Sequence, residues 1–117
     1  MTPRLRGAII GFGNIAELGH YPSYANSAEA EIVAVMDPSP SRREAAQALK
    51  LGLRAYETVD ALFRAEKLDF VDICTPPSSH TELALKALEQ HCHVLCEKPL
   101  TLKTSAYEEL SKAVAQS

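Results

Sequence analysis

The segment Gly11-Phe12-Gly13-Asn14-Ile15-Ala16, the glycine turn, has the residue types and the spacing of a phosphate-binding turn. Gly11 allows a tight turn out of the preceding apolar run, Gly13 leaves room for a pyrophosphate to approach the backbone, and Ala16 lets a helix pack closely on a strand. The N–H groups at the start of that helix then face the phosphate oxygens, and the helix dipole favours their negative charge. The pattern predicts a dinucleotide-binding strand–turn–helix unit in which Gly11, Phe12, Gly13, Asn14 and Ile15 touch the cofactor.

Asp37 ends a second apolar run, residues 31–36, at the place where such units carry an acidic residue. Its carboxylate would accept hydrogen bonds from the adenosine ribose, which favours NAD, because the 2′-phosphate of NADP would meet like charge. Arg42 and Arg43 follow closely and would offset this repulsion by pairing with that phosphate, so NADP is the alternative cofactor. Residues 37–40 also form turns readily, and the two roles of Asp37 are compatible.

Two further groups of polar residues follow the later apolar runs. Thr75 and Pro76 begin an extended exit from a strand, which would lie across the cofactor, and Ser79 is expected to cap the next helix. His80 has two open interpretations, a packed helix residue or a member of the binding site. Lys98 would donate a hydrogen bond to a substrate oxygen beside the nicotinamide, with Glu97 holding its ammonium group or contacting the nicotinamide ribose. The alternative for this pair is a solvated ion pair worth under about 1 kcal/mol.

Strand and helix signals alternate along the chain, which predicts an α/β fold with a doubly wound parallel sheet. Thr58 is expected to cap one helix and Gly52 to end another. The strand order 3-2-1-4-5 places the polar groups described above at the carboxyl ends of the strands, where such sheets bind ligands. The expected strands cover residues 4–10, 31–36, 54–56, 69–75 and 93–96, and the expected helices cover 14–20, 41–51, 58–65, 79–90 and 105–115.

The composition is that of one globular domain, residues 1–117, with a net charge of −3 that argues against nucleic acid or an anionic membrane as the main partner. No signal-peptide core follows the N-terminus, and three cysteines without a Cys-x-x-Cys motif suggest reduced thiols, so we expect a cytoplasmic protein. His91, Cys92, His93 and Cys96 resemble a metal motif, but alternation along a strand would separate the histidines from the cysteines. The sequence therefore predicts no metal site.

Taken together, the glycine turn, Asp37, the Thr75-Pro76 exit with His80, and Glu97-Lys98-Pro99 resemble the N-terminal Rossmann domain of the glucose-fructose oxidoreductase / inositol dehydrogenase / rhizopine-catabolism (Gfo/Idh/MocA) family. The resemblance implies an NAD(P)-dependent oxidoreductase that acts on sugars or polyols. It also implies that Lys98 contacts the reacting substrate oxygen.

Members of this family continue into a sixth strand and a second domain that supplies most substrate contacts, and both are missing from this sequence. We therefore expect cofactor binding without turnover by this chain alone. A non-enzymatic NAD(P)-binding module is the alternative, and an unrelated binder of adenine-containing ligands on the same fold stays open. Self-association through the edge of the fifth strand is also expected.

Overall fold

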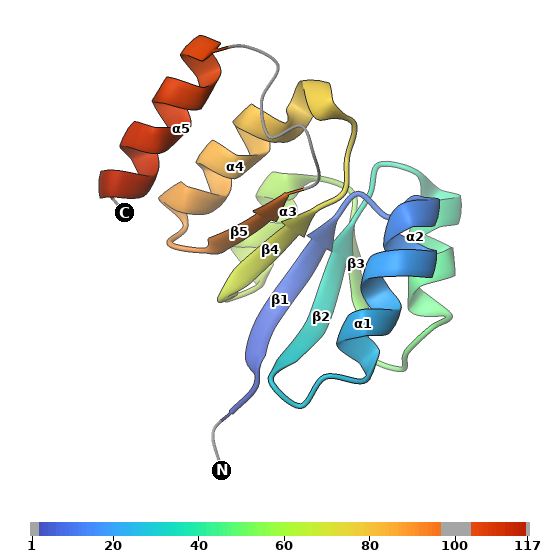
Figure 1. Cartoon of the computed structure of the whole chain (residues 1–117). Helices are drawn as coiled ribbons and strands as arrows, with labels where there is room; N and C mark the ends of the chain where they lie inside the picture. The colour runs from blue at the N-terminus through green and yellow to red at the C-terminus, as the bar shows by residue number, and fades with distance from the viewer. Residues whose placement is uncertain (1–2, 97–103, 117) are drawn as a thin grey trace.

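A parallel sheet of five strands forms the centre of the molecule in the computed structural model, which describes residues 3–96 and 104–116 (Figure 1). All neighbouring strands pair in parallel, and the order is β3-β2-β1-β4-β5, which confirms the predicted fold class and strand order. The order reverses between β1 and β4, and a ligand crevice is expected there, at the carboxyl ends of the strands. The strands are β1 (Leu5–Ile10), β2 (Ala30–Met36), β3 (Arg54–Tyr56), β4 (Phe70–Ile73) and β5 (His93–Cys96).

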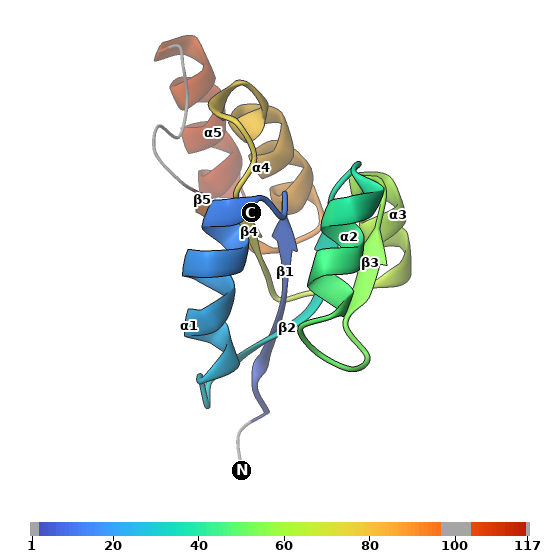
Figure 2. The same cartoon turned by 90° about the vertical axis from the view of Figure 1, so that its right-hand side faces the viewer.

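Helices cover both faces of the sheet, as Figures 1 and 2 show. Alternate side chains of the strands enter two separate cores: Ile9 packs with the helices that follow β1 and β2, whereas Ile10 packs with the later helices. Burial on both faces explains why β1 and β4 are nearly continuous apolar runs. The helical elements are η1 (Ala16–His20), α1 (Tyr21–Ala25), α2 (Pro40–Gln47), α3 (Val59–Ala65), η2 (Pro77–Ser79), α4 (His80–Glu89) and α5 (Thr104–Gln116).

The helix after β1 contains a π-helical turn, η1, in which the N–H of Tyr21 donates to the carbonyl of Ala16, five residues earlier. Pro22 explains this wider turn. It has no N–H, and in a regular α-helix its ring would clash with the carbonyl four residues before it. Short π-helical turns absorb such a clash without ending the helix. The chain therefore stays helical past Pro22, through α1.

Gly7 lets β1 approach β4 closely. A Cβ atom at this position would lie 2.1 Å from the ring of Phe70, and that ring also packs against Tyr24 at a centroid distance of 5.6 Å. Any larger residue at position 7 would have to displace Phe70 from the core. The same pair of strands carries the glycine turn at its carboxyl end.

The helix ends differ from the predictions in two places. Thr58 caps α3 as expected, with its Oγ1 accepting from the N–H of Ala61 at 3.1 Å. The predicted helix over residues 41–51 instead ends at Gln47, and Gly52 lies in the following turn with a φ of +87°. Ser79 does not cap α4, because its hydroxyl donates to the carbonyl of Pro76 at 2.8 Å within η2. No helix within the described ranges combines the length and the apolar character needed to cross a bilayer.

Candidate functional site

Gly11 holds the chain in a left-handed conformation directly after β1. Its φ is +88°, and a Cβ atom here would lie 2.7 Å from Cγ2 of Thr75 on the neighbouring loop. Its N–H donates to the carbonyl of Met36 at the end of β2, at 2.7 Å. Only glycine satisfies both the backbone conformation and this close approach. The turn is thereby fixed between the ends of β2 and β4.

Gly13 occupies the opposite environment, because a Cβ atom built there would have no neighbour within 4 Å. The helix begins just after it, and the N–H of Glu17 already donates to the carbonyl of Gly13 at 3.0 Å. The first N–H groups of a helix have no intrahelical acceptor, so they are available to a ligand at this helix start. Phe12 and Ala16 are fully buried beneath the turn, which keeps the helix close to the sheet. This arrangement fits a pyrophosphate lying across Gly13.

Asp37 binds two backbone N–H groups, one through each carboxylate oxygen. Oδ2 accepts from Phe12 at 2.8 Å and Oδ1 accepts from Ser39 at 2.9 Å. The carboxylate therefore ties the glycine turn to the start of α2, which is the turn-forming role considered from the sequence. Each oxygen keeps a second lone pair, so the same group can still accept hydrogen bonds from a ribose.

The two arginines after Asp37 also stabilise this region. Arg42 donates to the carbonyl of Phe12 at 2.6 Å and pairs with Glu17 at 2.7 Å. Arg43 donates to the carbonyl of Asp37 at 2.8 Å. The guanidinium groups thus hold the backbone of the turn and of the strand end. To pair with a 2′-phosphate, the guanidinium of Arg42 would have to share its N–H groups between the phosphate and its present partners, the Phe12 carbonyl and the Glu17 carboxylate, or release those partners.

His80 is completely buried at the start of α4. Its Nε2 lies 2.8 Å from the carbonyl of Thr75, and because a carbonyl only accepts, Nε2 carries the proton. This bond fixes the loop after β4, and the hydroxyl of Ser79 adds a second bond to Oγ1 of Thr75 at 2.6 Å. His80 also lines the cavity at the carboxyl ends of the strands, so its buried position is compatible with the predicted role in the binding site.

These elements surround a cavity of about 600 Å³ at the carboxyl ends of β1, β2 and β4. It brings together most of the predicted cofactor residues, whereas the side chains of Phe12, Asn14 and Arg42 are not part of its lining. Glu97 and Lys98 lie outside the described residues. The lining consists of Gly11, Gly13, Ile15, Asp37, Pro38, Cys74, Thr75, Pro76, Pro77 and His80.

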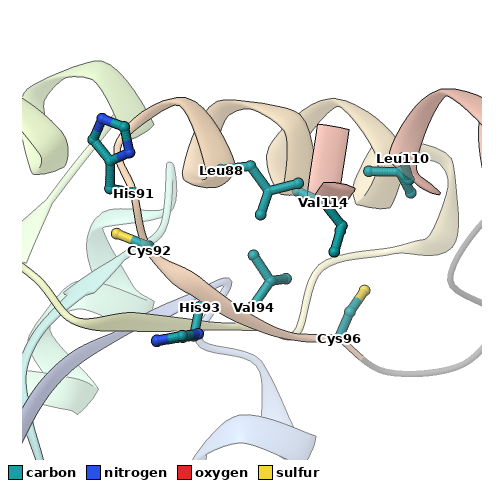
Figure 3. A pocket seen from close by; sticks show the side chains of 9 residues that line it. Leu88, His91, Cys92, His93, Val94, Cys96, Leu110 and Val114 are labelled. Atoms are coloured by element: carbon teal, nitrogen blue, oxygen red, sulfur yellow. The ribbon is translucent and has the colours of Figure 1, made fainter. Parts of the chain in front are cut away.

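A second cavity, of about 540 Å³, lies between α4, β5 and α5 (Figure 3). Cys92, Val94 and Cys96 pack toward the α4–α5 side, whereas His93 is exposed, which agrees with the predicted alternation along β5. Burial raises the pKa of the Cys92 thiol, and its Sγ donates to the carbonyl of Leu68 at 3.6 Å. The lining of this second cavity is mainly apolar. The polar groups suited to a dinucleotide lie in the first cavity, at the carboxyl ends of the strands.

A buried polar cluster at β4 was not predicted from the sequence. Asp72 is 1% exposed, and its Oδ2 accepts from Nδ1 of His20 at 2.6 Å and from the hydroxyl of Tyr24 at 2.8 Å. Burial and the Asp72 carboxylate raise the pKa of Tyr24, so this phenol stays protonated. A charged residue within the apolar run of β4 was the available signal, because a buried carboxylate requires hydrogen-bond donors.

The fold and the cavity together define a nucleotide-binding Rossmann domain. The glycine turn lies where the strand order reverses, after β1, and Asp37 follows the neighbouring strand β2. Residues 5–117 match the model of the oxidoreductase family with an NAD-binding Rossmann fold, and the chain belongs to this family, Gfo/Idh/MocA. The resemblance inferred from the sequence motifs and the prediction of an NAD-binding domain are therefore confirmed.

Relatives of known activity match the chain along nearly all of its length. It is 40% identical to D-glucoside 3-dehydrogenase of Escherichia coli over 109 residues, which cover 91% of this chain and 30% of that enzyme. It is 32% identical to inositol 2-dehydrogenase of Rhizobium meliloti, covering 95% of this chain and 33% of that enzyme. The crystal structure of an Agrobacterium radiobacter oxidoreductase in complex with NAD+, L-tartaric acid and magnesium superposes with a TM-score of 0.90 at 29% identity, covering 97% of this chain and 33% of that one. The chain thus spans about a third of the length of these relatives.

Proposed function

We propose that the cavity at the carboxyl ends of β1, β2 and β4 binds a nicotinamide dinucleotide as the cofactor part of a sugar or polyol oxidoreductase. The observation that carries the proposal is the open side of Gly13, which lies in one cavity with Asp37. The pyrophosphate lies across Gly13, and the carboxylate of Asp37 accepts hydrogen bonds from the adenosine ribose. The activities of the relatives, which act on a glucoside and on inositol, support this substrate class.

The bound nicotinamide supplies the hydride acceptor or donor, and the chain's own residues bind and orient it. Thr75 and Pro76 line the side of the cavity opposite Asp37, and the buried His80 keeps that loop in place. By family resemblance, Lys98 donates a hydrogen bond to the reacting substrate oxygen and Glu97 borders the nicotinamide. NAD is the expected cofactor because Asp37 opposes a 2′-phosphate, and NADP is the alternative.

The cofactor site is tested by exchanging one glycine that faces the cavity and one that does not. Gly13 and Gly19 both have open space around a built Cβ atom, so neither substitution to valine strains the packing. Gly13→Val should abolish NAD binding in calorimetry, because the new methyl groups occupy the pyrophosphate position, whereas Gly19→Val should bind like the unchanged chain. Absence of binding heat and of a thermal shift with NAD, NADH, NADP and NADPH at millimolar concentration would refute the proposal.

A non-enzymatic NAD(P)-binding module is the second candidate, because the lining of the cavity accounts for cofactor binding by itself. The mass of the polypeptide in its native source distinguishes the two. A product well above the 12.7 kDa of this chain supports the oxidoreductase, and a product of 12.7 kDa supports the module. We also propose a cytoplasmic location, supported by the cysteine content of the sequence, which is three cysteines without a Cys-x-x-Cys motif.

A further inference from the structure

Three side chains of types that can ligate a metal, from separate segments of the chain, meet near the end of β4. His20 ends the π-helical turn, Asp72 lies in β4, and Cys74 follows this strand. Nδ1 of His20 lies 2.6 Å from Oδ2 of Asp72 and 3.5 Å from Sγ of Cys74, and Sγ lies 3.6 Å from Oδ1 of Asp72. Their donor atoms all lie within 4.8 Å of one another. In the part of the chain that the structure describes, no other group of three such residues is this close.

The separations of these atoms suit a tetrahedral ion. Zinc binds sulfur at about 2.3 Å and nitrogen or oxygen at about 2.0–2.2 Å, so tetrahedral ligands lie roughly 3.3–3.6 Å apart. The contacts of Cys74 with Nδ1 of His20 and with Oδ1 of Asp72 already have this spacing. Nδ1 of His20 lies only 2.6 Å from the other oxygen, Oδ2, so the imidazole must move away from Oδ2 before Nδ1 can bind an ion. His20 is at the surface end of the cluster, with a side chain that is 22% exposed, so it has room for this movement.

The donor set also selects the kind of ion. One thiolate, one imidazole and one carboxylate suit zinc and similar transition metals, whereas magnesium and calcium prefer oxygen ligands alone. The Cys74 thiolate and the Asp72 carboxylate together carry two negative charges, which balance the charge of a divalent ion. Such a neutral complex is favoured because Asp72 is buried. The hydroxyl of Tyr24 donates to Oδ2 of Asp72 at 2.8 Å and would hold the ligating carboxylate in place.

We infer that His20, Asp72 and Cys74 form a binding site for a divalent transition-metal ion, with zinc as the expected occupant. Binding releases the thiol proton of Cys74 to solvent. Nδ1 of His20 gives up its proton to solvent and Nε2 takes one up, so the ligating imidazole is neutral with its proton on Nε2. Cys74 also lines the cofactor cavity, so the ion would lie between this cavity and the helix that follows the glycine turn. The site requires no bound nucleotide and is independent of the function proposed above.

Cobalt is the probe, because a thiolate bound to Co²⁺ gives a charge-transfer absorption that free Co²⁺ lacks. The unchanged chain should show this band with one equivalent of Co²⁺, and Zn²⁺ should displace the ion. Cys74→Ser should remove the band and weaken Zn²⁺ binding at least tenfold. The control variants Cys92→Ser and Cys96→Ser remove the other two thiols and should keep both signals.

His20→Gln provides a second test that keeps all three cysteines. It should weaken Zn²⁺ binding at least tenfold in competition with a chelating dye, and circular dichroism establishes that the variant is folded. If His20→Gln does not fold, the cysteine variants decide the question alone. The inference is overturned if the unchanged chain gives no cobalt–thiolate band, or if the band survives in Cys74→Ser.

Discussion

The carboxylate of Asp37 accepts a 2.8 Å hydrogen bond from the backbone N–H of Phe12, inside the glycine turn. Its other oxygen accepts from the N–H of Ser39 before α2. One side chain therefore sets the shape of the turn and lines the cofactor cavity. A substitution here should change both the affinity for the cofactor and the choice between NAD and NADP.

Asp37→Asn should weaken NAD binding by about tenfold and reduce the preference for NAD over NADP. The neutral amide keeps one acceptor oxygen, so one of the two backbone N–H groups loses its acceptor and faces an NH2 group, at a cost of about 1–3 kcal/mol. Calorimetry with both dinucleotides measures the two effects. Asp60→Asn is the control, because Asp60 lies on the exposed surface of α3 and should leave both affinities unchanged. Tighter binding of NADP than of NAD by the unchanged chain would contradict this account of Asp37.

The stability of the domain should depend on the ionisation of Glu66. Arg54 lowers the pKa of this carboxyl group through hydrogen bonds, against the opposing effect of burial, and the Tyr56 hydroxyl donates to it at 2.5 Å. Because the folded-state pKa is depressed, the stabilisation is present above the unfolded-state value of about 4.3 and is lost as the pH falls through the folded-state value.

Glu66→Gln should therefore lower the free energy of unfolding by about 1–3 kcal/mol at pH 7 and by less at pH 3. Urea unfolding at the two pH values measures this difference. Glu31→Gln is the control, because the Glu31–Lys50 pair is more exposed and should contribute under about 1 kcal/mol. An equal loss at both pH values would show that the Glu66 side chain acts through packing alone.

The 117-residue chain alone should have no measurable dehydrogenase activity. Hydride transfer requires a substrate carbon held against the nicotinamide and a base that takes the hydroxyl proton. Lys98 is a hydrogen-bond donor, and an ordinary lysine is protonated at neutral pH. Missing base catalysis costs about 10²–10⁴-fold in rate, and lost positioning adds to that. Formation of NADH by the purified chain with any member of a sugar and polyol panel would disprove the prediction.

The edge strand β5 should mediate self-association. It pairs with β4 on one side, and no described strand lies on its other side. Leu95 is 52% exposed there, and no charged residue within β5 discourages pairing with a second copy. Leu95→Lys should lower the sedimentation coefficient at high concentration, whereas Leu51→Lys, at a fully exposed leucine in a distant turn, should not. A chain that is strictly monomeric at every concentration would exclude the association.

Local sequence signals determined much of the fold. The conformations of Gly11 and of the Thr58 cap follow from residue types within a few positions, and the apolar runs of β1 and β4 follow from burial on both faces. These features depend on nearest-neighbour chemistry and on side-chain periodicity, which a single sequence contains. The alternation of strands and helices comes from the same signals, and the strand order follows from it through the general topology of doubly wound sheets.

Tertiary packing decided which side chains form hydrogen bonds with residues that are distant in the sequence. His20 and Asp72 are 52 residues apart, and Arg42 reaches back 30 residues to the carbonyl of Phe12. These partners depend on how the helices are placed against the sheet, which a single sequence does not contain. The sequence shows that Asp72 is a charged residue in an apolar strand, but the three-dimensional fold alone determines that a histidine, a tyrosine and a cysteine surround it.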